Sequence, residues 1–156
     1  MSQKNVKNVG ASVRQKLLNR ARADGRPYQA VAQLYAMERF LFRLGASDVA
    51  ERFILKGGLM TMTWAAEYAR LTKDIDLLGR GASSVDDVVA SMKRVLHTEV
   101  SDDGVAYDSS SVSGARIMVD AAYVGVRVKC VGDIGGMVVR LQLDVGFGDA
   151  VVPPPQ

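Results

Sequence analysis

Phe53-Ile-Leu-Lys-Gly-Gly58 and Arg70-Leu-Thr-Lys-Asp-Ile-Asp-Leu-Leu78 are the two sequences from which the fold is predicted. Each contains an apolar run of strand length, and the residues between them have a helical pattern from about 58 to 69. Because side chains alternate along a strand, Asp74 and Asp76 share one face while their aliphatic neighbours supply a core. We therefore predict a strand, a helix and a second strand that presents two carboxylates.

These two motifs contain the groups that a metal–nucleoside triphosphate site requires. Lys56-Gly-Gly58 is a glycine turn before a helix, and backbone N–H groups at a helix N-terminus bind phosphate. Asp74 and Asp76 supply the hard oxygen ligands that Mg²⁺ prefers. Each motif alone is weak evidence, because Gly-Gly commonly only permits a tight turn and a lone Asp-x-Asp is usually a surface feature. Their combination, with a third aspartate further along, is more informative.

The third carboxylate is Asp144, in Leu141-Gln-Leu-Asp-Val-Gly-Phe-Gly-Asp149. If this strand lies beside Asp74–Leu78, Asp144 joins the two earlier aspartates on one face. Three carboxylates would hold two Mg²⁺ ions, one activating a hydroxyl nucleophile and the other bridging a triphosphate. Without a cation they would repel one another and lose hydration, so divalent ions are their natural partners.

The rest of the chain is predicted as helices followed by a β meander. Further helices are expected at about 11–23, 27–44 and 85–100. Ser12 is the candidate cap of the first of these helices, and Ser84 is that of the last. After Val100 the pattern favours strands at about 105–107, 116–119, 123–131 and 137–146, with Val124, Val126, Val128 and Cys130 alternating with polar residues. Gly132-Asp-Ile-Gly-Gly136 is expected to be the hairpin turn that precedes the last strand.

This order of elements predicts an α/β (α+β) fold: a small mixed sheet with helices packed on one face, preceded by N-terminal helices. We expect one domain over residues 1–156. Within it, residues 1–50 are a helical lead, 51–150 the core and 151–156 a tail.

Composition restricts the class of protein. Cys130 is the single cysteine, which excludes an internal disulfide framework, and with His97 as the one histidine an ordinary zinc site is excluded too. The sequence shows neither a signal segment nor an apolar run of membrane-spanning length, so a cytoplasmic protein without a membrane partner is expected. The net charge of +3 permits a nucleic-acid partner without arguing for one.

Four motifs, in order, resemble the nucleotidyltransferase toxins of the AbiEii/AbiGii group, within the polymerase-β-like nucleotidyltransferase superfamily. They are Arg39-Phe-Leu-Phe-Arg-Leu44, Phe53-Ile-Leu-Lys-Gly-Gly58, Arg70-Leu-Thr-Lys-Asp-Ile-Asp76 and Leu143-Asp-Val-Gly-Phe-Gly-Asp149. The resemblance covers residues 39–149 and implies a minimal nucleotidyltransferase fold.

The resemblance also implies a role for each motif residue. Gly57 and Gly58 would cradle the triphosphate, and Lys56 would face its phosphates. Arg70 would do the same, although pairing with a nearby carboxylate is an equal alternative. The catalytic and metal-binding residues would be Asp74, Asp76 and Asp144.

The activity implied by the resemblance is Mg²⁺-dependent transfer of NMP from an NTP to an RNA hydroxyl, such as a tRNA 3′ end. The protein would be the toxin of a toxin–antitoxin or phage-defence system, with a cognate antitoxin as partner. Relatives continue past the last motif into a helical half, which we expect to be absent here. That absence leaves an alternative open: a truncated, catalytically inactive module that binds a nucleotide or a partner.

Overall fold

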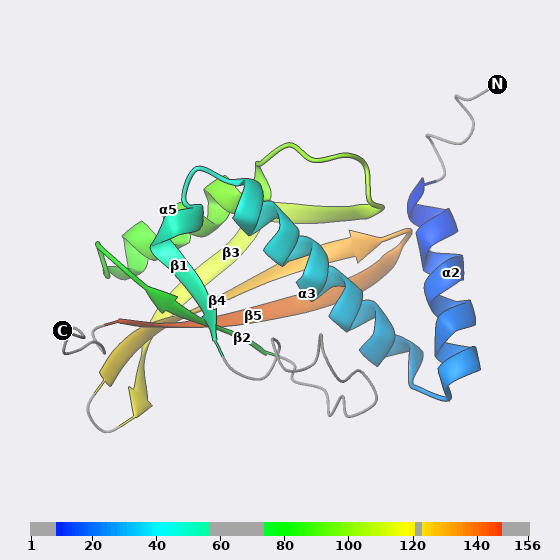
Figure 1. The fold of residues 1–156 in the computed structure, drawn as a ribbon, viewed down its shortest axis with the longest axis horizontal. Helices are drawn as coiled ribbons and strands as arrows, with labels where there is room; N and C mark the ends of the chain where they lie inside the picture. Colours follow the sequence, from blue (N-terminus) through cyan, green and yellow to red (C-terminus); the bar gives the residue numbers. More distant parts are fainter. Residues whose placement is uncertain (1–8, 57–73, 121–122, 148–156) are drawn as a thin grey trace.

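The computed structural model describes residues 9–56, 74–120 and 123–147 (Figure 1). Along the chain the elements are α2 (Val9–Asp24), α3 (Tyr28–Ala46), the 3₁₀ turn η1 (Ala50–Arg52), β1 (Phe53–Lys56), β2 (Asp74–Gly79), α5 (Val85–Leu96), β3 (Val105–Asp120), β4 (Tyr123–Ile134) and β5 (Met137–Phe147). The helix expected at 58–69 lies outside the described residues. Among the described helices, none is long and apolar enough to span a membrane.

The strands form one mixed sheet in the order β1-β2-β5-β4-β3. β2 and β5 are parallel, and every other neighbouring pair is antiparallel. The last strand of the chain therefore lies in the middle of the sheet, beside β2. This arrangement confirms the predicted small mixed sheet.

The core lies between the sheet and two helices, α3 and α5, which cover one face (Figure 1). Apolar residues recur three and four positions apart along both helices, and every second residue of the central strands points toward them. The largest fully buried side chains include Met37, Phe40, Ile75, Leu77, Val88, Met92, Val126, Leu141 and Leu143. Because the helices occupy this face, the alternate residues of β2, β4 and β5 point to the opposite face.

The helix boundaries differ in part from those expected. Ser84 caps α5 as predicted, because its Oγ accepts a hydrogen bond from the Asp87 backbone N–H at 3.0 Å. However, α5 ends at Leu96 rather than near residue 100, and the Thr98 hydroxyl donates to the Arg94 carbonyl at 2.9 Å beyond it. Ser12 is not a cap, because α2 already begins at Val9 and encloses it.

The β meander has fewer and longer strands than expected. The two strands predicted near 105–107 and 116–119 are one strand, β3, whose register against β4 shifts between Asp108 and Ser113. A β-bulge of this kind accommodates extra residues without ending a strand, which local sequence pattern does not reveal. The β4–β5 turn is also shorter: Gly135 and Gly136 form it alone, with φ of 59° and 98°. Positive φ at both positions is typical of a tight hairpin and favours glycine.

Candidate active site

Asp76 and Asp144 are brought together by the parallel pairing of β2 with β5. Their Cα atoms are register partners across the two strands. On β2, Ile75 and Leu77 are fully buried toward the helices, whereas Asp74 and Asp76 are half-buried on the other face. The expected neighbourhood of the β2 and β5 aspartates therefore follows from the strand order.

A cation flanks this acid pair on each side. Lys56 is the register partner of Asp76 on β1, and Arg127 is that of Asp144 on β4. Lys56, Asp76, Asp144 and Arg127 thus form a line across four strands, which we call the charged row. All four line a cavity of about 200 Å³, together with Ile117, Met118 and Gly146.

Arg127 is the member of the charged row that sequence reasoning missed. Its Nε donates to Asp144 Oδ1 at 2.8 Å and its Nη2 donates to Oδ2 at 3.0 Å. Both hydrogen bonds and the charge of Asp144 raise the pKa of Arg127, so the guanidinium stays charged. The available signal was its place among the polar residues that alternate with the valines of β4.

The negative charge of Asp76 is less well compensated by hydrogen bonds and ion pairs than that of Asp144. Burial raises the pKa of Asp76, and the neighbouring carboxylates of Asp144 and Asp74 raise it further, while Lys56 acts in the opposite direction. No hydrogen bond from the described residues reaches its carboxylate. A half-buried carboxylate with like charges beside it is a suitable ligand for a divalent cation.

The residues therefore fit Mg²⁺ by the chemistry of their donors, with Asp76 and Asp144 as the adjacent pair. In the described part of the chain, no group of three or more Asp, Glu, His or Cys side chains is disposed to hold a metal. The three-aspartate ligand set, and the catalytic role of its members, accordingly stays a prediction.

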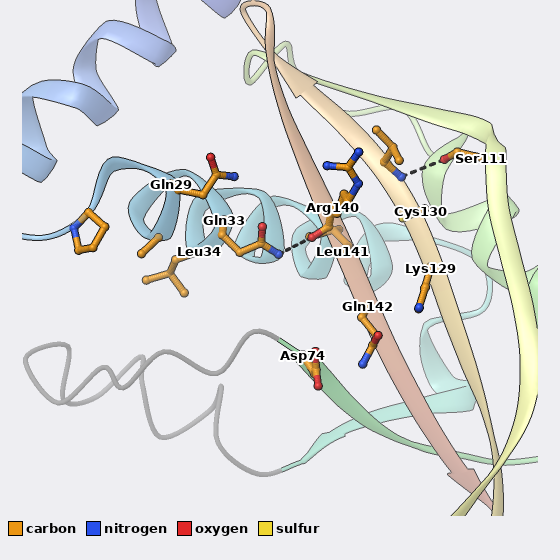
Figure 2. Close-up of a pocket in the computed structure, with 13 residues that line it drawn as sticks. Gln29, Gln33, Leu34, Asp74, Ser111, Lys129, Cys130, Arg140, Leu141 and Gln142 are labelled. Carbon is orange, nitrogen blue, oxygen red and sulfur yellow. Dashed lines mark hydrogen bonds between the residues drawn. The ribbon is translucent and has the colours of Figure 1, made fainter.

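Asp74 borders a different, larger cavity. Its register partner on β5 is Gln142, which in turn pairs with Lys129 on β4, so these three make a second row beside the charged row. Figure 2 shows them along one wall of a cavity of about 750 Å³. The first half of α3 provides another wall, where the Gln33 amide donates to the Arg140 carbonyl (Figure 2).

The remaining predicted site residues are not placed. Gly57, Gly58 and Arg70 lie outside the described residues, as does Asp149. The phosphate-binding roles expected of the first three stay predictions. Lys56, the phosphate-facing candidate that is described, stands at the end of β1 with an exposed side chain.

Comparison with known proteins identifies the family. The family described as nucleotidyl transferase AbiEii toxin, type IV toxin–antitoxin system, matches residues 39–156. No curated protein and no solved structure matches the chain. The matched region contains the whole charged row and most of the described chain. The chain therefore belongs to the AbiEii family of nucleotidyltransferase toxins of type IV toxin–antitoxin systems.

Proposed function

We propose that this protein transfers a nucleotidyl group from an NTP to a hydroxyl of RNA in a Mg²⁺-dependent reaction. The hydroxyl oxygen forms a bond to the α-phosphorus as the bond between the α- and β-phosphates breaks, and pyrophosphate leaves. A tRNA 3′ end is the proposed acceptor. The observation that carries this proposal is the pairing of Asp76 with Asp144 inside the charged row. Family membership supports nucleotidyl transfer itself and implies an NTP substrate and an antitoxin partner.

In this proposal the side chains of the charged row have separate roles. Asp76 and Asp144 hold Mg²⁺, with Asp74 contributing from the next row of the same face. Held there, Mg²⁺ would supply positive charge that favours deprotonation of the attacking hydroxyl and offsets the charge of the phosphates. Lys56 binds phosphate oxygens of the NTP as a compact positive charge. The alignment of hydroxyl and phosphate depends on these positions, because phosphoryl-type transfer relies mainly on positioning and electrostatics.

One cation within the second row and one beside it favour a polyanionic acceptor. Lys129 and Arg140 are both exposed, and both line the larger cavity together with Gln33 and Gln142. Lysine and arginine neutralise RNA phosphates, and side-chain amides hydrogen-bond base edges or sugar hydroxyls. Since Asp74 lines the same cavity, an RNA end bound there would approach the carboxylates from this side.

The test is label transfer to RNA. Wild type, Asp76→Asn and Asp86→Asn are incubated with each labelled NTP, Mg²⁺ and total RNA. Asp86 is an exposed aspartate in the first turn of α5 and serves as the matched control. We expect labelled RNA from wild type and Asp86→Asn, at least about 100-fold less from Asp76→Asn, and none with EDTA.

Two results would contradict this proposal. Equal label transfer by wild type and Asp76→Asn would show that the acid pair is not the active site. Thermal stabilisation by Mg²⁺ and NTP without label transfer to any RNA would instead indicate a nucleotide-binding module.

A further inference from the structure

Arg127 occupies the oxygens that the proposed function gives to the cation. Its guanidinium donates to both Oδ1 and Oδ2 of Asp144, at 2.8 Å and 3.0 Å. A carboxylate offers about four lone-pair positions, and a bidentate guanidinium uses two of them. Two positions remain, but Mg²⁺ on them would lie close to the guanidinium and the two positive charges would repel each other. Mg²⁺ and Arg127 therefore compete for Asp144.

We propose that Arg127 exchanges partners when substrate binds: it pairs with Asp144 in the free protein and with a phosphate oxygen of the nucleotide once Mg²⁺ is bound. This inference rests on the proposed function and adds a nucleotide-binding residue to it. The planar guanidinium suits such an exchange, because its N–H donors match carboxylate and phosphate oxygens equally well.

The charge of the row supports this exchange. Two cations and two carboxylates make the charged row neutral in the free protein. A divalent ion between the carboxylates would leave it with two positive charges, which a polyphosphate then neutralises. Cation and nucleotide binding are consequently coupled, each strengthening the other.

The space around Arg127 also permits the exchange. The Arg127 side chain is 39% exposed, compared with 19% for Asp144, so the guanidinium can turn away without unpacking the core. The cavity of about 200 Å³ is smaller than ordinary sites for whole small molecules, which begin at about 300 Å³. It suits one phosphate group with its cation, and the guanidinium lies at its wall.

The test measures cation and nucleotide binding separately, without turnover. Free Mn²⁺ is followed by electron paramagnetic resonance to obtain its affinity in the absence of nucleotide. Calorimetry with Mn²⁺ present then gives the affinity for an α,β-methylene NTP analogue. The variants are Arg127→Gln, Arg127→Lys, and Arg116→Gln as control. Arg116 is exposed on β3 and pairs with Val126, which is buried toward the helices. Arg116 therefore lies on the face of the sheet opposite to that of Arg127.

We expect opposite shifts in the two affinities of Arg127→Gln. Loss of the competing positive charge should tighten Mn²⁺ binding about tenfold. Loss of a charged phosphate contact should weaken analogue binding about tenfold or more. Both affinities of Arg127→Lys should lie between those of Arg127→Gln and wild type, since lysine keeps the charge but loses the paired N–H donors of the guanidinium. Arg116→Gln should match wild type in both measurements.

Wild-type affinity of Arg127→Gln for either Mn²⁺ or the analogue would overturn the inference, as would weaker Mn²⁺ binding. That failure can be told apart from failure of the proposed function. If the wild-type protein binds Mn²⁺ and the analogue, and Arg127→Gln binds both equally well, only this inference fails. If the wild-type protein binds neither, both proposals fail. If Arg127→Gln fails to fold by circular dichroism, Arg127→Lys provides the comparison.

Discussion

Asp103 and Asp144 are each held by two N–H donors of one arginine, in very different surroundings. Asp103, just before β3, is held by Arg43 at 2.8 and 3.0 Å and by Arg39 at 2.7 Å. Asp103 and Arg43 are almost fully buried, with side chains 7% and 8% exposed. Asp144 has the single fork of Arg127, is more exposed, and faces another carboxylate, Asp76.

This difference distinguishes a structural cluster, formed by Asp103 with Arg39 and Arg43, from a cluster whose carboxylates are incompletely neutralised and can bind a ligand, formed by Asp76 and Asp144. Burial acts to raise the pKa of Asp103, yet hydrogen bonds from Arg43 and Arg39 lower it overall. Burial also raises the pKa of Asp76, and there the neighbouring Asp144 adds to the effect. The Asp103 cluster therefore anchors α3 to β3, which explains both arginines of the Arg39–Leu44 motif.

The largest expected effect on stability is that of breaking the Asp103 cluster. Asp103→Ala leaves the buried Arg43 without its carboxylate, and an uncompensated buried charge costs about 3–5 kcal/mol. Urea denaturation should show this loss in the free energy of unfolding. As control, Asp48→Ala breaks the exposed ion pair with Arg94 and should leave that free energy unchanged within error. A similar small change in both variants would contradict an anchoring role for Asp103.

The same cluster should make stability depend on acid pH. Because the folded-state pKa of Asp103 is lowered below 3.8, its contribution is present above pH 3.8 and is lost as the pH falls through the folded-state value. We therefore expect wild type to lose stability below about pH 4 more steeply than Asp103→Asn. Thermal unfolding between pH 2 and 6 measures both slopes, and equal slopes would exclude Asp103 as a source of acid sensitivity.

Tyr107 allows a smaller test of the same cluster. Its hydroxyl donates to the Ala36 carbonyl at 2.6 Å, and its ring lies 4.8 Å from the Arg43 guanidinium carbon. Tyr107→Phe keeps the ring and its edge contact with Phe40 but removes the hydroxyl. The expected loss is about 1–2 kcal/mol in urea denaturation. A loss as large as that of Asp103→Ala would mean that the hydroxyl, not the ion pairs, dominates this region.

The sequence was enough to place each site aspartate on a strand, because alternation of polar and apolar residues is local. It was not enough to find Arg127, because its partner depends on the β4–β5 register. A turn at residues 132–136 would pair Val131 with Met137 and bring Asp144 opposite Val124. The actual two-glycine turn pairs Ile134 with Met137 and brings Asp144 opposite Arg127. An error of three residues at the turn therefore concealed the guanidinium fork.

From the sequence, the pairing of β2 with β5 could be assumed but not predicted. Nothing local indicates that the last strand inserts beside β2 rather than at the edge of the sheet, because that choice depends on packing over a long sequence separation. Arg43 shows the same limit: its place in the helix expected at 27–44 was visible, but its carboxylate partner, sixty residues away, was not.

The smallest expected effect on stability belongs to the acid pair itself. Asp76→Asn removes a like charge beside Asp144 and takes no hydrogen bond from a described residue. The free energy of unfolding without metal should lie within about 0.5 kcal/mol of wild type, on the stabilising side. Addition of Mg²⁺ should then raise the unfolding temperature of wild type but not of Asp76→Asn, because ligands that bind only the folded state stabilise it. Differential scanning fluorimetry with and without Mg²⁺ measures both parts. A large loss of stability in Asp76→Asn without metal would place Asp76 with Asp103, as a structural carboxylate, and would remove the contrast between the two clusters.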